Sequence, residues 1–147
     1  MSVGGRVGYD HLDMAKARDL ISRAVALVAR LRTELPLGRR GERAAEKYLK
    51  RNGYRIVARN FRASGAEIDL VAIDGETLVF VEVRLRRNRA FGGAAESITA
   101  TKRRRLRLAA QHYLGSLARE PPCRFDAILL DGLAAENIEW LRGIDID

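Results

Sequence analysis

Acidic side chains lie inside two neighbouring apolar runs of this chain. Asp69 falls in the run at residues 67–74 and Glu82 in the run at residues 78–86, with Asp74-Gly75 at the turn between them. Asp-Gly between β-rich runs predicts a hairpin. Residues two apart share one face of a strand, so pairing of the two runs brings Asp69 beside Glu82, with Arg84 next to them.

Carboxylates among Val, Ile, Leu and Phe side chains are costly to bury unless they bind something. Hard oxygen ligands suit Mg²⁺ or Mn²⁺, so the pattern predicts a divalent metal site at Asp69 and Glu82. Such an ion supports phosphodiester hydrolysis, because it activates water and offsets charge on the phosphoryl and leaving oxygens. A neighbouring cation orients the water or holds the scissile phosphate, which is the role expected of Arg84.

Glu42 is a further candidate, at the expected first turn of a helix over residues 39–51. Two interpretations have equal weight for this residue. It belongs to the metal site, or its charge stabilises the helix N-terminus by under about 1 kcal/mol.

The charge balance favours a polyanionic partner. The chain has 147 residues, with 27 Lys and Arg against 19 Asp and Glu, a formal net charge of +8. The basic residues cluster near the carboxylates, which favours phosphate contacts over a merely solvated face. The residues predicted to bind nucleic acid are Arg86, Arg87, Lys102, Arg103, Arg104 and Arg105.

The remaining composition excludes several classes of site. A single cysteine excludes an internal disulfide and a Cys-rich zinc site, and two histidines argue against a His-based metal centre. No apolar run approaches the roughly 18 residues that span a membrane. We therefore expect a cytoplasmic protein with no membrane partner.

Hydrophobic periodicity predicts an α/β fold with a mixed sheet. The expected helices cover residues 13–34, 39–51 and 101–117, and the expected strands cover residues 54–61, 67–74, 78–86, 124–131 and 138–141. Pro36-Leu37-Gly38 marks a boundary. We expect an N-terminal extension at residues 1–36 and a main domain at residues 37–147.

The helix expected at residues 13–34 is basic and amphipathic. It either packs its apolar stripe on the domain or on a partner subunit, which we favour, or touches a membrane or nucleic acid.

A set of short motifs occurs in order over about residues 38–145, and it resembles the uncharacterised YraN family of bacterial nuclease-like proteins. That family in turn resembles archaeal Holliday junction resolvases and the PD-(D/E)xK restriction-endonuclease-like superfamily. The motifs are Gly41-Glu42, Arg59-Asn60-Phe61-Arg62, Glu67-Ile68-Asp69-Leu70-Val71, Phe80-Val81-Glu82-Val83-Arg84-Leu85-Arg86, Phe91-Gly92 and Lys102-Arg103-Arg104-Arg105-Leu106.

The resemblance implies a three-layer α/β/α fold around a central mixed sheet. It implies that Asp69 and Glu82 bind the metal, that Glu42 projects toward it, and that Glu67 is a supporting acid. One departure concerns the cation, because the family pattern ends in Lys where this chain has Arg84. Arginine keeps the charge and binds phosphate, but it does not release a proton at physiological pH.

Two functions from different classes follow. The first is a Mg²⁺- or Mn²⁺-dependent endonuclease acting on DNA, with branched structures as candidate substrates. The alternative is a nucleic-acid-binding module that keeps the fold but is catalytically impaired by Arg84. A third reading is an interaction protein assembled through its N-terminal helix. DNA versus RNA stays open, and a homodimer would suit two cuts on a symmetric junction.

Overall fold

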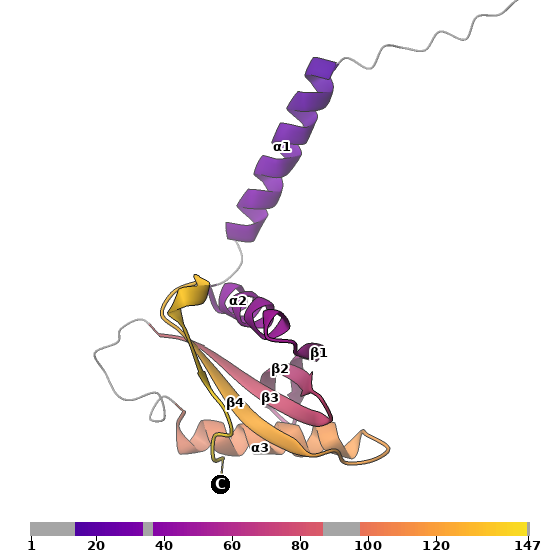
Figure 1. Cartoon of the computed structure of the whole chain (residues 1–147), viewed down its shortest axis with the longest axis vertical. Helices are drawn as coiled ribbons and strands as arrows, with labels where there is room; N and C mark the ends of the chain where they lie inside the picture. Colours follow the sequence, from indigo (N-terminus) through magenta and orange to yellow (C-terminus); the bar gives the residue numbers. More distant parts are fainter. Residues whose placement is uncertain (1–13, 34–36, 87–97, 147) are drawn as a thin grey trace, which may run out of the picture. The chain divides into compact units, whose positions relative to one another are not determined.

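The computed structural model describes residues 14–33, 37–86 and 98–146 (Figure 1). The chain divides into two compact units, residues 1–35 and 36–147. The first unit contains α1 (Met14–Thr33), whose side chains Leu20, Ile21 and Val25 are exposed. The packing of this apolar stripe on the domain or on a partner subunit stays a prediction. No helix within the described ranges is both long and apolar enough to cross a membrane.

The second unit follows the predicted order of helices and strands. Its elements are α2 (Leu37–Arg51), β1 (Arg55–Ala63), β2 (Ala66–Asp74), β3 (Thr77–Leu85), α3 (Ala100–Gly115), β4 (Cys123–Leu130), the 3₁₀ helix η2 (Ala135–Asn137) and β5 (Ile138–Leu141). The short helix η2 was not predicted. Residues 87–97, between β3 and α3, lie outside the described residues.

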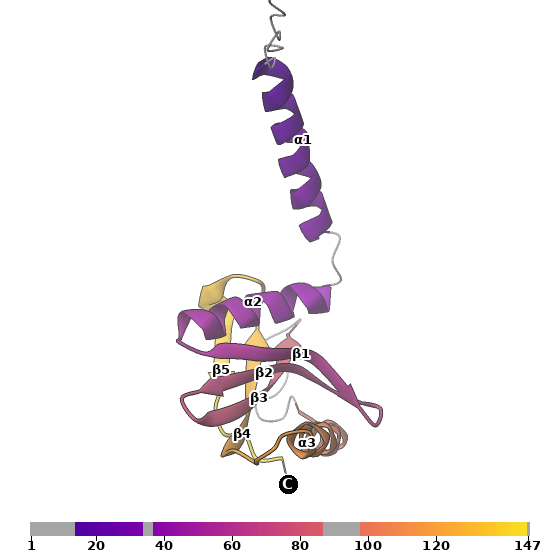
Figure 2. The same cartoon turned by 90° about the vertical axis from the view of Figure 1, so that its right-hand side faces the viewer.

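The strands form one mixed sheet in the order β1-β2-β3-β4-β5. The β3–β4 pair is parallel and the others are antiparallel. A parallel pair needs a crossover, and this crossover contains α3. The helices α2 and α3 cover opposite faces of the sheet (Figures 1 and 2). The predicted three-layer α/β/α arrangement is confirmed.

The β2–β3 hairpin has a two-residue loop. Asp74 pairs with Thr77, which leaves Gly75 and Glu76 as the loop. Gly75 has φ +60°, a left-handed conformation that suits the first loop residue of a type II′ turn. This tight turn fixes the register of the two strands, and with it the positions of Asp69 and Glu82.

Alternation along β3 assigns its side chains to the two faces. Phe80 joins the cluster under α3 with Leu106 and Ala109, whereas Val81 joins the cluster under α2 with Leu49. Residues two apart share a face. Glu82 therefore lies on the α3 side of the sheet.

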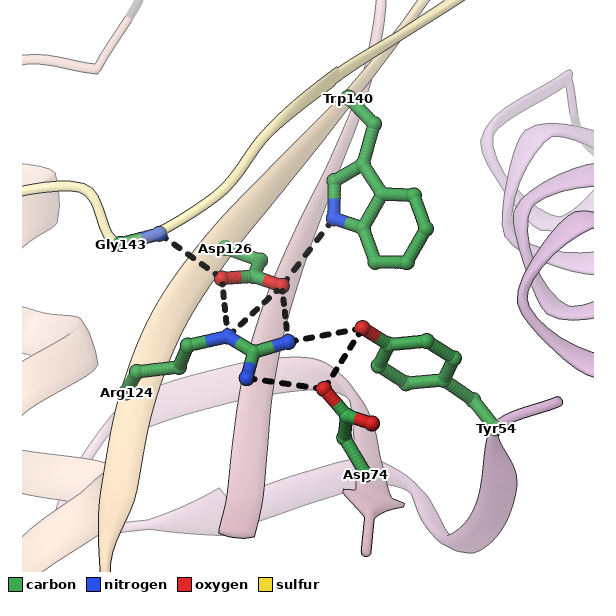
Figure 3. A network of polar contacts seen from close by, with 6 residues as sticks. All are labelled: Tyr54, Asp74, Arg124, Asp126, Trp140 and Gly143. Atoms are coloured by element: carbon green, nitrogen blue, oxygen red, sulfur yellow. Dashed lines mark hydrogen bonds and ion pairs between the residues drawn. The ribbon is translucent and has the colours of Figure 1, made fainter. Parts of the chain in front are cut away.

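A buried aspartate ties β4 to the C-terminal segment (Figure 3). Asp126 is 0% exposed and accepts hydrogen bonds from Trp140 Nε1 at 3.1 Å, Gly143 N at 3.0 Å and Arg124 Nε at 3.1 Å. Arg124 also donates to Asp74 Oδ2 at 3.0 Å and to the Tyr54 hydroxyl at 2.9 Å. The network joins the segment that follows α2, the tip of the β2–β3 hairpin, and strands β4 and β5.

We predict that Asp126→Ala destabilises the protein by about 3–5 kcal/mol, because the change leaves the Trp140 and Gly143 donors without their acceptor and removes one of the two carboxylates that pair with Arg124. Urea unfolding followed by circular dichroism measures the loss. The matched control is Asp74→Ala, which removes a more exposed partner of the same arginine and should cost less. An equal loss in the two variants would contradict the assignment.

Candidate functional site

The candidate site lies where β2 and β3 separate. Their paired residues end at Leu70 and Val81, although both strands continue beyond that point. Asp69 and Glu82 are the next residues on each strand. The Val83 N–H donates to Asp69 Oδ2 at 2.8 Å. This hydrogen bond to a side chain lies just past the last residues that pair between the two strands.

Glu82 has one satisfied and one unsatisfied carboxylate oxygen. The residue is 4% exposed, and its Oε1 lies 3.1 Å from Lys102 Nζ on α3. Its Oε2 is buried and has no hydrogen-bond partner within the described parts of the chain. Buried polar atoms are nearly always paired, so an orphan oxygen here needs an explanation. A bound cation supplies one.

Electrostatics point the same way for Asp69. Burial, followed by the Glu82 charge, raises the pKa of its carboxyl to about 7, although the Val83 N–H and Lys102 act in the opposite direction. Two carboxylates this close do not both ionise without compensation. The carboxylate pair, Asp69 and Glu82, thus fits either a shared proton or a divalent cation.

The position of Glu42 corrects one of the two sequence interpretations. Helix α2 begins at Leu37 and has no acidic residue in its first turn, so the expectation of Glu42 in that turn was wrong. Stabilisation of the helix N-terminus therefore does not account for it. Glu42 Oε2 instead accepts from Asn60 Nδ2 at 2.8 Å, and its charge also raises the Asp69 pKa.

Asn60 has φ 47° on β1, at the residue between the partners of Leu70 and Ile68. Asparagine tolerates this left-handed backbone better than most residues. Sequence reasoning missed this residue as a partner of the site, although it lies in a quoted motif.

The described residues contain no group of three or more His, Cys, Asp or Glu side chains arranged to hold a metal. The metal-binding roles of Asp69 and Glu82, and that of Glu42, stay predictions.

Arg84 and Glu67 occupy different surroundings. Arg84 is half-buried and, two residues after Glu82, shares its face of the sheet. Glu67 forms an ion pair with Arg62, with 3.0 Å between Oε2 and Nε. Its predicted role as a supporting acid stays a prediction.

The predicted phosphate-binding residues gather at the start of α3. An open pocket of about 560 Å³ is lined by Ile98, Ala100, Arg103, Arg104, Arg107 and Ile146. Arg105 is exposed on the same helix. The first turn of α3 carries no acidic residue. Cations beside the positive end of a helix dipole favour a bound anion.

Two other predicted contacts are placed differently. Arg86 donates to both carboxylate oxygens of Asp131, at 2.8 and 3.0 Å, and lies 3.0 Å from a Glu139 oxygen. Its charge is therefore offset within the protein, and its predicted nucleic-acid contact stays a prediction. Arg87 lies outside the described residues.

Lys102 is the site residue whose place the sequence did not reveal. It was grouped with the phosphate-binding residues, but its ammonium lies on Glu82. A local signal exists, because Thr99 caps α3 by accepting from the Lys102 N–H at 3.2 Å. The cap fixes where the helix starts, but not that its first turn lies over β3.

We predict opposite pH effects on stability for two aspartates in metal-free buffer. The folded pKa of Asp69 lies above its ordinary 3.8, so the native state binds the extra proton and stability falls as pH rises from about 4 to about 7. Asp69→Asn removes this penalty. Its melting temperature should exceed that of the wild type at about pH 8, and the gain should shrink toward about pH 4.

Asp74→Asn is the control of opposite sign. The Tyr54 hydroxyl, followed by Arg124, lowers the pKa of Asp74, so its stabilisation is present above the ordinary pKa and is lost in acid. This variant should melt below the wild type near neutral pH. A loss of stability in Asp69→Asn at alkaline pH would refute the assignment of a raised pKa to Asp69.

Comparison with known proteins identifies the family. A model described as uncharacterised protein family UPF0102 matches residues 41–130. A UPF0102 protein of Nitrosospira multiformis is 54% identical over 105 residues, covering 71% of this chain and 88% of the relative. A UPF0102 protein of Dechloromonas aromatica is 54% identical over 105 residues, covering 71% of this chain and 84% of the relative. A UPF0102 protein of Cupriavidus taiwanensis is 55% identical over 107 residues, covering 71% of this chain and 79% of the relative. The chain therefore belongs to uncharacterised protein family UPF0102, the YraN nuclease-like family to which its motifs pointed.

Proposed function

We propose that this protein is a metal-dependent endonuclease that hydrolyses phosphodiester bonds in DNA, with branched structures as the favoured substrates. The observation that supports this most is the carboxylate pair beside a basic helix: Asp69 is half-buried, and Glu82 is buried with one oxygen that has no partner among the described residues. A DNA substrate would place the protein in the cytoplasm.

The carboxylate pair would hold Mg²⁺ or Mn²⁺, with Glu42 nearby on α2. The ligand atoms are oxygens, which these ions prefer, and Glu82 Oε2, which has no partner among the described residues, is available to a cation. When bound, such an ion lowers the pKa of a water and acts as a Lewis acid toward phosphoryl oxygens.

The chain's own residues would position the substrate. Arg84 would hold a non-bridging oxygen of the scissile phosphate, which its forked guanidinium suits. Water oxygen then bonds to phosphorus while the bond to the leaving sugar oxygen breaks. The proton released by the water finally resides on the leaving oxygen or in solvent.

Arginines at the start of α3 would bind the flanking backbone. Arg104 and Arg105 are exposed there, and the pocket beside them is lined by further arginines. Contacts of this kind position a duplex without reading its bases. We therefore propose recognition of nucleic-acid structure rather than of sequence.

One observation favours a binding module instead. Arg84 stands where a lysine was expected from the family pattern, and arginine does not give up its proton at neutral pH. If that position must exchange a proton with water, the protein binds DNA without cutting it.

We predict that Glu82→Gln loses at least about a hundredfold in cleavage rate, because it removes a ligand charge. The assay uses labelled junction, flap and single-stranded DNA, with Mn²⁺ and then Mg²⁺. DNA affinity should hold or rise in this variant, since a negative charge is lost. Glu76→Gln, in the exposed hairpin loop, is the matched control.

The outcomes separate the two functions. Cleavage by the wild type and Glu76→Gln but not by Glu82→Gln supports the nuclease. An inactive wild type with activity gained in Arg84→Lys supports a site disarmed by one residue. Silence from all variants while DNA binding persists would overturn the nuclease for these substrates.

We also predict that the double variant Arg104→Ala, Arg105→Ala binds DNA with a weaker salt dependence. Removal of two phosphate contacts should reduce the slope of log affinity against log salt by about 2. Fluorescence anisotropy over a salt series measures this slope. Arg51→Ala, which removes an exposed cation at the end of α2, should leave the slope unchanged.

A further inference from the structure

We propose that Lys102, which comes from helix α3 and not from a strand, is the lysine of the reaction centre: its ammonium orients Glu82 and contacts the scissile phosphate. This inference rests on the proposed nuclease function. It changes the assignment of the cation, which the sequence pattern gave to Arg84 alone.

The contact between Lys102 and Glu82 carries the inference. Nζ lies 3.1 Å from Oε1, and the two side chains are 30% and 5% exposed. The lysine thus reaches from an accessible helix onto a buried carboxylate. The Lys102 side chain is therefore partly accessible from solvent while its ammonium contacts a buried carboxylate.

Lysine chemistry suits this position. An ammonium carries three donors on a compact charge. One donor serves Glu82 Oε1, which leaves the others for a phosphate oxygen or a water. The same contact separates the two Glu82 oxygens, because Oε1 faces the lysine while Oε2 has no partner among the described residues. Oε1 of Glu82 is thus held by the ammonium, and Oε2 is the oxygen that would bind a ligand.

The place of Lys102 in its helix argues against a purely structural ion pair. It is the third residue of α3, whose first turn holds no acid. A cation there is disfavoured by the helix dipole. A bound anion next to Lys102 would offset that cost, and the pocket formed by Arg103, Arg104 and Arg107 shows that positive charge is concentrated on this part of α3.

The first measurement is Mn²⁺ binding by the DNA-free protein, followed by calorimetry. Lys102→Met keeps the length of the side chain and removes a charge that repels a cation held by Glu82. We expect binding about tenfold tighter in this variant. Lys47→Met, which removes an exposed cation from α2, is the matched control and should bind Mn²⁺ like the wild type.

The second measurement is single-turnover cleavage at saturating Mn²⁺. A lysine that contacts phosphate is required even when the metal site is full. We expect Lys102→Met to cut at least about a hundredfold more slowly. Lys102→Arg keeps the charge and guards against loss of folding, and it should recover part of the rate. Circular dichroism spectra establish that each variant is folded.

Each outcome decides the inference. Tighter Mn²⁺ binding with slow cleavage supports it. Tighter binding with cleavage as fast as the wild type overturns it, because Lys102 then only competes with the metal. Unchanged or weaker Mn²⁺ binding in a folded Lys102→Met protein also overturns it, while the nuclease function stands if the wild type cuts. A wild type that neither binds Mn²⁺ nor cuts overturns the proposed function and this inference together.

Discussion

The arrangement of the candidate site depends on the repulsion between two acidic side chains at a fork between strands, the half-buried Asp69 and the buried Glu82. Asp69 and Glu82 lie just past the last paired residues of β2 and β3. There the Val83 N–H donates a hydrogen bond to the Asp69 carboxylate. Burial and mutual repulsion raise the Asp69 pKa. Such an arrangement costs stability unless a cation compensates it. Helix α3 supplies the positive charge of Lys102 at Glu82 Oε1, while Glu82 Oε2 has no partner in the described ranges.

The layered fold explains how the residues around the pair reach it. Helix α2 approaches one face of the sheet closely at Gly41, where a Cβ would lie 3.1 Å from Leu130 Cδ1. That approach brings Glu42, the next residue, near enough to act on Asp69. Helix α3 covers the other face and brings Lys102 onto Glu82. The pair is thus influenced from both helical layers.

Local patterns predicted the strands, the Gly75 turn and the proximity of Asp69 to Glu82, because strand alternation and turn chemistry act over a few residues. The start of α2 was placed two residues late, since Leu37-Gly38 was interpreted as part of the break. The contacts of Lys102 and Arg86 were not predicted. Both depend on how segments far apart in the chain meet: α3 over β3, and the ends of β4 and β5 beside Arg86.

Two buried acids in this protein, Asp126 and Glu82, differ in how completely their carboxylate oxygens are hydrogen-bonded within the described part of the chain. Asp126 is fully buried, yet a tryptophan, a backbone N–H and an arginine satisfy both of its oxygens. These hydrogen bonds hold β4 to the C-terminal segment. Glu82 is buried almost as deeply, but only one of its oxygens has a partner among the residues that the structure describes. An internal network that stops halfway is costly in a core, and its open end is the position from which a ligand would be bound.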